Sequence, residues 1–323
     1  MNIKISPEGV PDYNAIANVN YQAFLNWHPN NQYVSEPILV DLLRHSSFFD
    51  PELSLVAKLK DQIVGHALFT PFKFIVLGEE QMGVILGPIA VTPGYQRLGI
   101  GRQLIEEGHK RAKSKGYTFS LLCGHETYYP RFGYKTEMFS VSGSRVKIVN
   151  NDFSHEGFSE RPVNDGDIPW IRKAWNDQHN QDSLALSPGQ SISDWCNHKA
   201  KCCSTVISFQ DKILGYARYA KTTPLIVKEI LVLDENMELT LQYLGKGQIE
   251  FSVPLAANTL TKVLDPYRFQ VLDNRNALEP FMIKVIENES LIDRYCTQVE
   301  AGSIQPGIIV FPSIFDLDDG VID

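Results

Sequence analysis

The amino-acid sequence predicts a mixed α/β fold arranged as two domains. The chain has 323 residues, more than the roughly 100–200 that one hydrophobic core usually organises. Within 82–123, two apolar runs of strand length flank an amphipathic helical pattern. Charge is uneven: residues 1–155 contain 15 Lys and Arg against 14 Asp and Glu, whereas the remainder contains 15 against 24. We therefore expect one domain over 1–150, a polar linker over 151–160 and a more acidic domain over 161–323.

The first half begins with helical periodicity and continues with strands. Apolar residues recur at threes and fours over 11–27, and a second, short helix is expected over 36–45. Strands are expected over 53–59 and 63–74, joined by a charged turn. The almost entirely apolar run at 82–91 (MGVILGPIAV) is typical of a central strand buried on both faces.

A glycine-rich turn and a helix follow this central strand. The turn reads TPGYQRLGIG, and the helix is expected over 100–115. Its predicted buried face consists of the residues at helical spacing, namely Ile100, Leu104, Ile105, Gly108 and Ala112. A second buried strand is expected over 117–123, and a last strand near 135–148.

The second half repeats this order of elements without visible sequence identity. A strand entering a helix is expected over 161–176, and a hairpin joins the strands predicted over 204–209 and 213–220. Another apolar strand is expected over 225–233. The sequence thus predicts a second α/β unit of related design.

Composition excludes several classes of protein. With 43% hydrophobic and 21% charged residues, the chain is neither mainly disordered nor a coiled coil. No apolar run is long enough to span a membrane, and no signal-like core is visible near residue 1, so a cytoplasmic protein is expected. The five cysteines fit neither a disulfide framework nor a metal site. The net charge of −8 argues against nucleic acid as a partner.

The turn QRLGIG is the strongest functional signal. Gly99 and Gly101 allow the backbone to approach a ligand, and the turn opens directly into a helix. N–H groups of a first helical turn lack intrahelical acceptors and carry partial positive charge, which suits a phosphate or pyrophosphate. Arg97 and Arg102 add charge at the rim. The pattern matches neither the Rossmann fingerprint nor the Walker A loop.

In its context, this turn resembles the pyrophosphate loop of a known family. The segment 83–134 (GVILGPIAVTPGYQRLGIG…YYPRFGY) resembles the GNAT family of acetyl-CoA-dependent N-acetyltransferases, in particular its bacterial YhbS-like branch. The likeness covers about 3–148. It implies a central mixed sheet splayed at a strand bulge, for which Gly87-Pro88 is suited. The second half resembles a degenerate GNAT-like domain, because no such turn follows its apolar strand.

The resemblance also implies where acetyl-CoA binds as cosubstrate. Main-chain groups of Ile89, Ala90 and Val91 would face the pantetheine amides and the thioester carbonyl. The pyrophosphate would lie on the amides of the turn and first helical residues, Gln96, Arg97, Leu98, Gly99, Ile100, Gly101 and Arg102.

Tyr129 matches the family tyrosine that protonates the leaving thiolate, with Tyr128 as a neighbouring substitute. The general base is open: Glu126 is one candidate, and His125, His66 or a water chain are others. Cys123, at the end of an apolar strand, fits packing better than nucleophilic catalysis.

The expected activity is direct transfer of an acetyl group from acetyl-CoA to a primary amine of a small molecule or peptide, in a ternary complex. The alternative is a non-catalytic acyl-CoA-binding regulatory protein. The second half could cover the acceptor cleft, bind a partner or form a homodimer, and its acidic balance would favour a cationic acceptor.

Overall fold

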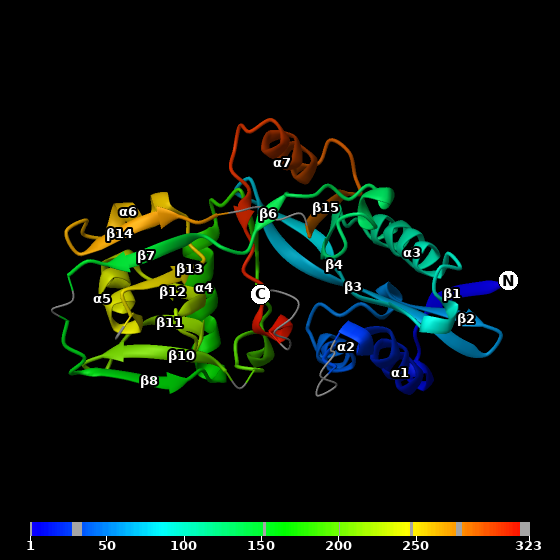
Figure 1. Ribbon diagram of the computed structural model, residues 1–323, viewed down its shortest axis with the longest axis horizontal. Coiled ribbons are helices and arrows are strands. Elements are labelled where there is room, and N and C mark those ends of the chain that lie inside the picture. Colours follow the sequence, from blue (N-terminus) through cyan, green and yellow to red (C-terminus); the bar gives the residue numbers. More distant parts are fainter. Residues whose placement is uncertain are drawn as a thin grey trace.

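The computed structural model describes residues 2–27, 34–150, 153–199, 201–245, 248–275 and 280–316. Two seven-stranded sheets lie next to each other along the long axis of the molecule (Figure 1). Each sheet carries helices on both faces, so the predicted mixed α/β class is confirmed. None of the helices in these described ranges is long and apolar enough to cross a membrane.

The first sheet has the strand order β1-β2-β3-β4-β5-β15, with β9 paired to β3. Its strands are β1 (Ile3–Pro7), β2 (Ser54–Leu59), β3 (Gln62–Val76), β4 (Glu79–Val91), β5 (Phe119–Cys123), β9 (Leu184–Leu186) and β15 (Phe281–Val285). All pairs are antiparallel except β4 with β5, which is parallel.

Strand β4 contains the predicted bulge. Its pairing with β3 shifts between Ala67 opposite Ile89 and Phe69 opposite Leu86, so β4 carries an extra residue at Gly87-Pro88. The parallel pairing of β4 with β5 lies before this point, at Val84 and Ile85. The two strands therefore separate beyond the bulge, as the resemblance implied.

Helices cover both faces of this sheet, and the side chains of β4 point alternately to one face and to the other. Ile85 faces the cluster that contains α1 (Tyr13–Phe24) and α2 (Glu36–Arg44), whereas Val84 and Leu86 face α3 (Ile100–Ser114). The predicted apolar face of α3 is confirmed, since all five of its residues are buried. At Gly108 a Cβ atom would lie only 2.1 Å from the Phe69 ring, so this glycine allows close packing of helix on sheet.

The second sheet has the order β14-β7-β13-β12-β11-β10-β8. Its strands are β7 (Ser144–Ile148), β8 (Phe158–Pro162), β10 (Cys202–Phe209), β11 (Lys212–Ala220), β12 (Ile226–Val232), β13 (Glu250–Val253) and β14 (Phe269–Asp273). Helices α5 (Asp234–Leu244) and α6 (Ala257–Val263) cover one face and α4 (Ile168–His179) the other. The predicted hairpin is confirmed as β10–β11.

The chain crosses between the two sheets more often than the sequence suggested. The strand expected near 135–148 is β7, and it belongs to the second sheet rather than completing the first. In return, β15 pairs with β5, and α7 (Leu291–Glu300) packs on the first unit. β6 (Phe139–Ser140) pairs with β16 (Gly307–Ile308). A domain boundary at residue 150 stays a proposal. The sheets exchange strands across it, since β7 belongs to the second sheet and β9 and β15 belong to the first.

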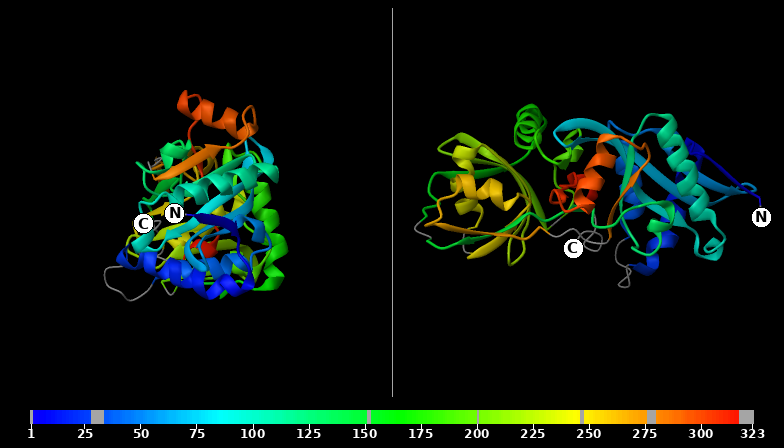
Figure 2. Two further views of the ribbon diagram at one scale, coloured as in Figure 1. Left: turned by 90° about the vertical axis from the view of Figure 1, so that its right-hand side faces the viewer. Right: turned by 90° about the horizontal axis from the view of Figure 1, so that it is seen from above.

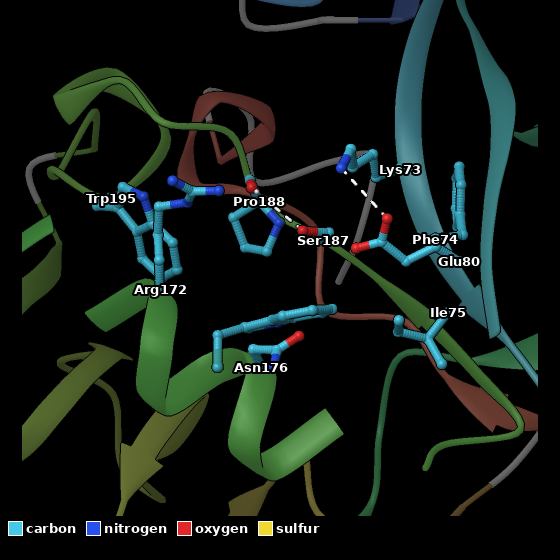
Figure 3. Close-up of a pocket in the computed structure, with 10 residues that line it drawn as sticks. Lys73, Phe74, Ile75, Glu80, Arg172, Asn176, Ser187, Pro188 and Trp195 are labelled. Carbon is cyan, nitrogen blue, oxygen red and sulfur yellow. Dashed lines mark hydrogen bonds and ion pairs between the residues drawn. The ribbon is translucent and has the colours of Figure 1, made fainter. Parts of the chain in front are cut away.

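A shared core joins the two units. Trp175 of α4 and Tyr216 of β11 form one apolar cluster with Ile75 of β3. Beside this cluster lies a cavity of about 70 Å³, where Lys73 pairs with Glu80 at 3.3 Å across from Trp195 and Arg172 (Figure 3). The Lys73 and Glu80 side chains in this cavity are exposed, so it opens to solvent at the edge of the shared core.

Candidate active site

A cleft of about 920 Å³ opens where β4 and β5 separate. Its walls include β4 from Ile85 to Val91, the start of α3, and the segment from Cys123 to Phe132. α1, α2 and two C-terminal phenylalanines complete the lining. Such a volume is in the range of small-molecule and cofactor sites.

The start of α3 has the geometry expected of an anion site. Gly99 is the N-cap and has φ +78°, a conformation that strongly favours glycine, and Arg97 has φ +63°. At Gly101 a Cβ atom would lie 3.0 Å from the Tyr128 hydroxyl, which leaves little room for a side chain. The first residues of this 15-residue helix line the cleft, so its first-turn N–H groups, which have no intrahelical acceptor, lie at the cleft wall.

Two of the three expected main-chain groups of β4 face the open side of the strand. Thr92 donates its N–H to the Val64 carbonyl at 3.0 Å, and successive residues turn their amide groups to opposite sides. The amide groups of Ile89 and Val91 thus face away from β3, and Gln96 donates its side-chain amide to the Val91 carbonyl at 3.0 Å. Those of Ala90 face β3, and its side chain is buried in the core.

Of the seven residues expected around the pyrophosphate, six line the cleft. Gln96, Arg97, Gly99, Ile100, Gly101 and Arg102 are among the lining residues. The side chain of Leu98 is 50% exposed and does not line the cleft. Arg102 forms an ion pair with Glu106 at 2.8 Å on the next turn of α3.

Tyr129 lies in the cleft wall as the first residue of a 3₁₀ turn, η5 (Tyr129–Phe132). Its ring packs against Tyr134 at 5.9 Å between centroids and over Gly124, where a Cβ atom would approach within 2.3 Å. Burial, with smaller contributions from Tyr128 and Cys123, raises the pKa of Tyr129 well above its usual value. The phenol is therefore neutral at physiological pH and retains a proton that it can donate.

Tyr128 and Cys123 also line the cleft but differ from Tyr129. The Tyr128 hydroxyl lies beside Gly101 at the start of α3, whereas the Tyr129 ring packs over Gly124 just after β5. Burial raises the pKa of the Cys123 thiol to about 11, so the thiolate needed for nucleophilic attack is scarce.

The candidate general bases differ in whether they line the cleft. Glu126 is exposed and does not line the cleft. His66 is fully buried between Asn20 and Ser54, at 3.1 Å from each, and burial together with Arg44 lowers its pKa to about 3. His125 does line the cleft and packs edge-on against Trp27 at 5.0 Å.

Three lining residues carried no signal in the sequence. Glu36, in the first turn of α2, is only 5% exposed and lines the cleft. Phe311 and Phe315 reach the cleft from the C-terminal part of the chain. Local patterning cannot identify them, because only the tertiary fold brings these distant segments together.

Comparisons with known proteins agree with this geometry. A family profile described as Acetyltransferase (GNAT) domain matches residues 12–136. The uncharacterized N-acetyltransferase YjhQ of Escherichia coli K12 is 37% identical over 103 residues, which cover 32% of this chain and 57% of YjhQ. The uncharacterized N-acetyltransferase YhbS of the same strain is 30% identical over 117 residues, covering 32% of this chain and 69% of YhbS.

The fold extends beyond these matches. A GCN5-related N-acetyltransferase from Anabaena variabilis superposes with a TM-score of 0.65 over 88% of this chain and 73% of that protein, at 14% identity. At this identity the likeness concerns the fold alone, and it includes both sheets. The splayed strands, the helix entry and the sequence matches together show that this chain belongs to the GNAT family of acetyltransferases.

Proposed function

We propose that this protein transfers an acetyl group from acetyl-CoA directly to a primary amine. The observation that carries the proposal is the continuity of one cleft, which joins the start of α3, the bulged part of β4 and Tyr129. Anion binding, thioester positioning and acid catalysis are thus available within a single cavity. The chain spans 57% of the length of YjhQ, so its activity is inferred from its own site.

In the proposed binding mode, the first-turn amides of α3 hold the pyrophosphate, with Arg97 and Arg102 at the rim. The amide groups of Ile89 and Val91, on the open side of β4, hydrogen-bond to the pantetheine arm as they would to a neighbouring strand. The thioester then lies near Gly87-Pro88, where β4 leaves β5. An N–H donor at this point would stabilise negative charge on the carbonyl oxygen.

The proposed chemistry has one bond formed and one broken. The deprotonated amine nitrogen attacks the thioester carbon, and the carbon–sulfur bond breaks as the tetrahedral intermediate collapses. Tyr129 donates its phenolic proton to the departing sulfur, which its place in the cleft wall supports, and the phenolate then regains a proton from water. The amine proton leaves through water or His125, the member of the candidate bases that lines the cleft. Glu126 has no part in this scheme.

The test is release of free CoA thiol when the purified protein is mixed with acetyl-CoA and a panel of primary amines. We expect amine-dependent release and an acetylated amine of matching amount. Tight acetyl-CoA binding without any release across the panel would contradict the enzyme and favour a regulatory acyl-CoA-binding protein.

A further inference from the structure

The C-terminal segment 309–316 connects the cleft of the first unit to a buried charge cluster of the second. In Figure 2 this segment, in red, lies between the two sheets. Phe311 and Phe315 line the cleft, whereas Asp316 is buried against β11 and β12. A short stretch of chain therefore contacts both units at once.

The second unit holds this segment at two points. The Arg218 guanidinium, 2% exposed, pairs with Asp316 and donates to the Phe311 carbonyl at 2.6 Å. Lys228 pairs with Asp316 at 3.0 Å, and Glu229 lies 3.4 Å from Arg218. Because a buried charge is costly unless it is paired, this cluster fixes the segment on either side of Phe315.

The part of the cleft beside this segment is aromatic. Phe315 packs on Phe311 at 5.5 Å, and α2 packs against the 3₁₀ turn η8 (Ser313–Phe315). From α1 and the turn after it, Phe24 and Trp27 line the same cleft with their rings 5.9 Å apart. Each of these two ring pairs offers apolar surface to a flat group bound in the cleft.

Charge along the cleft is polarised. Among the described lining residues, Glu36 is the one carboxylate, and it is the first residue of α2, the helix that packs against η8. The arginines of the lining, Arg97, Arg102 and Arg131, come from the α3 entry and η5. A cationic group is thus favoured on the α2 side of the lining rather than at the α3 entry, which carries arginines.

We infer that the acceptor is a primary amine attached to an aromatic body, an arylalkylamine. Its ring packs on Phe311 and Phe315, and its ammonium group is attracted by Glu36 before it loses a proton. Arg218 acts as a positioning residue, because it holds both phenylalanines through the C-terminal segment. The inference rests on the proposed function for the transfer step, but its recognition chemistry can be tested by binding alone.

The experiment is calorimetric titration of the CoA-saturated full chain with 2-phenylethylamine, ethylamine, spermidine and the neutral 2-phenylethanol. We expect 2-phenylethylamine to bind at least about tenfold more tightly than the other three, since burial of a phenyl ring and a charge each contribute on this scale. Phe311→Ala or Phe315→Ala should remove most of the advantage over ethylamine. Glu36→Gln should remove the advantage over 2-phenylethanol.

Matched measurements separate recognition from folding. Tyr267→Ala removes an 83% exposed ring far from the cleft and should leave all affinities unchanged. CoA affinity should stay within about twofold in the phenylalanine variants, since their rings pack on Phe72 and Phe139 and the expected pyrophosphate site is on α3. Asp316→Asn should reduce the preference for 2-phenylethylamine in the same direction, with CoA affinity retained.

The failure of this inference differs from failure of the proposed function. Equal binding of ethylamine, spermidine and 2-phenylethylamine, or a preference unaffected by Phe311→Ala and Phe315→Ala, would overturn the arylalkylamine assignment even if acetyl transfer occurs. Selective binding without release of CoA thiol would support the assignment and contradict the transferase.

Discussion

The two units share a sheet design but differ at the helix that follows the splayed strand. In the first unit β4 pairs in parallel with β5 over a short stretch and α3 follows; in the second, β12 pairs in parallel with β13 at Ile226 and α5 follows. The entry of α3 has two glycines and no acidic residue in its first turn. The first turn of α5 has Asp234 and Glu235.

This difference is electrostatic as well as architectural: Gly99 at φ +78° ends the turn before α3, whereas α5 begins two residues after the end of β12 with Leu233 in an extended conformation. Carboxylates at a helix N-terminus use the same partial positive charge that would otherwise attract a phosphate, and they repel an anion. The repeated sheet therefore supplies a frame in both units, and the chemistry of one helix entry distinguishes them. That the second unit binds no CoA stays a prediction of the sequence.

The largest expected effect is at the entry of α3. Gly101→Glu should weaken CoA binding by more than about 100-fold, which corresponds to about 2.7 kcal/mol. The side chain would compete with the Tyr128 hydroxyl for space and place a negative charge beside the pyrophosphate. Calorimetry should show one CoA per chain before the substitution and none after it.

Gly9→Glu is the matched control, because it adds the same charge at a position with ordinary contacts remote from the cleft. Two CoA molecules per wild-type chain, with one remaining in Gly101→Glu, would show that the second unit also binds CoA. One CoA in both proteins would show that the α3 entry does not bind it.

The next largest effect concerns Tyr129, the proposed general acid. Tyr129→Phe should lower kcat by about 100-fold, a usual contribution of general acid catalysis, with the KM for acetyl-CoA nearly unchanged. Tyr128→Phe, at the α3 entry, should instead change CoA affinity more than kcat. Steady-state kinetics with the best amine of the panel measure both variants. Unchanged turnover in Tyr129→Phe would move the acid to another group.

A smaller effect is the loss of folding stability at low pH that His66 causes in the first unit. The pKa of His66 is lowered from 6.5 to about 3 by burial and by Arg44, so the unfolded chain binds this proton first as the pH falls. Stability present above pH 6.5 should therefore be lost towards pH 3, at up to about 1.4 kcal/mol per pH unit from this residue. His66→Gln should be less stable near neutrality but should lose stability less steeply.

Chemical unfolding followed at several pH values from about 6 to 5 measures that slope. The slope of the wild type should exceed that of His66→Gln by the equivalent of about one proton. An identical slope would mean that His66 is accessible to protonation in the folded protein.

Local features of the fold could be predicted from the sequence where short-range physics decides them. The buried face of α3, the β10–β11 hairpin and the bulge at Gly87-Pro88 follow from periodicity and from the backbone chemistry of Gly and Pro. The roles of Gly99 and Gly101 in the turn before α3 could be predicted from the backbone chemistry of glycine in the same way. These elements depend on residues within a few positions of one another.

Long-range pairing could not be predicted in this way. The alternation of β7 predicts a strand with one buried face, but it does not specify which sheet provides the partner. The same limit applies to Phe311 and Phe315, which reach the cleft because Arg218 holds their segment. The resemblance does not distinguish Ala90 from Ile89 and Val91, whereas strand geometry turns the amide groups of Ala90 to β3.

The most direct test of the central claim is a crystal structure of the full chain with CoA bound. The account predicts one CoA per chain, with its pyrophosphate on the amides at the start of α3 and its sulfur beside the Tyr129 hydroxyl in the gap between β4 and β5. CoA bound at the start of α5, or a sulfur atom far from Tyr129, would contradict it.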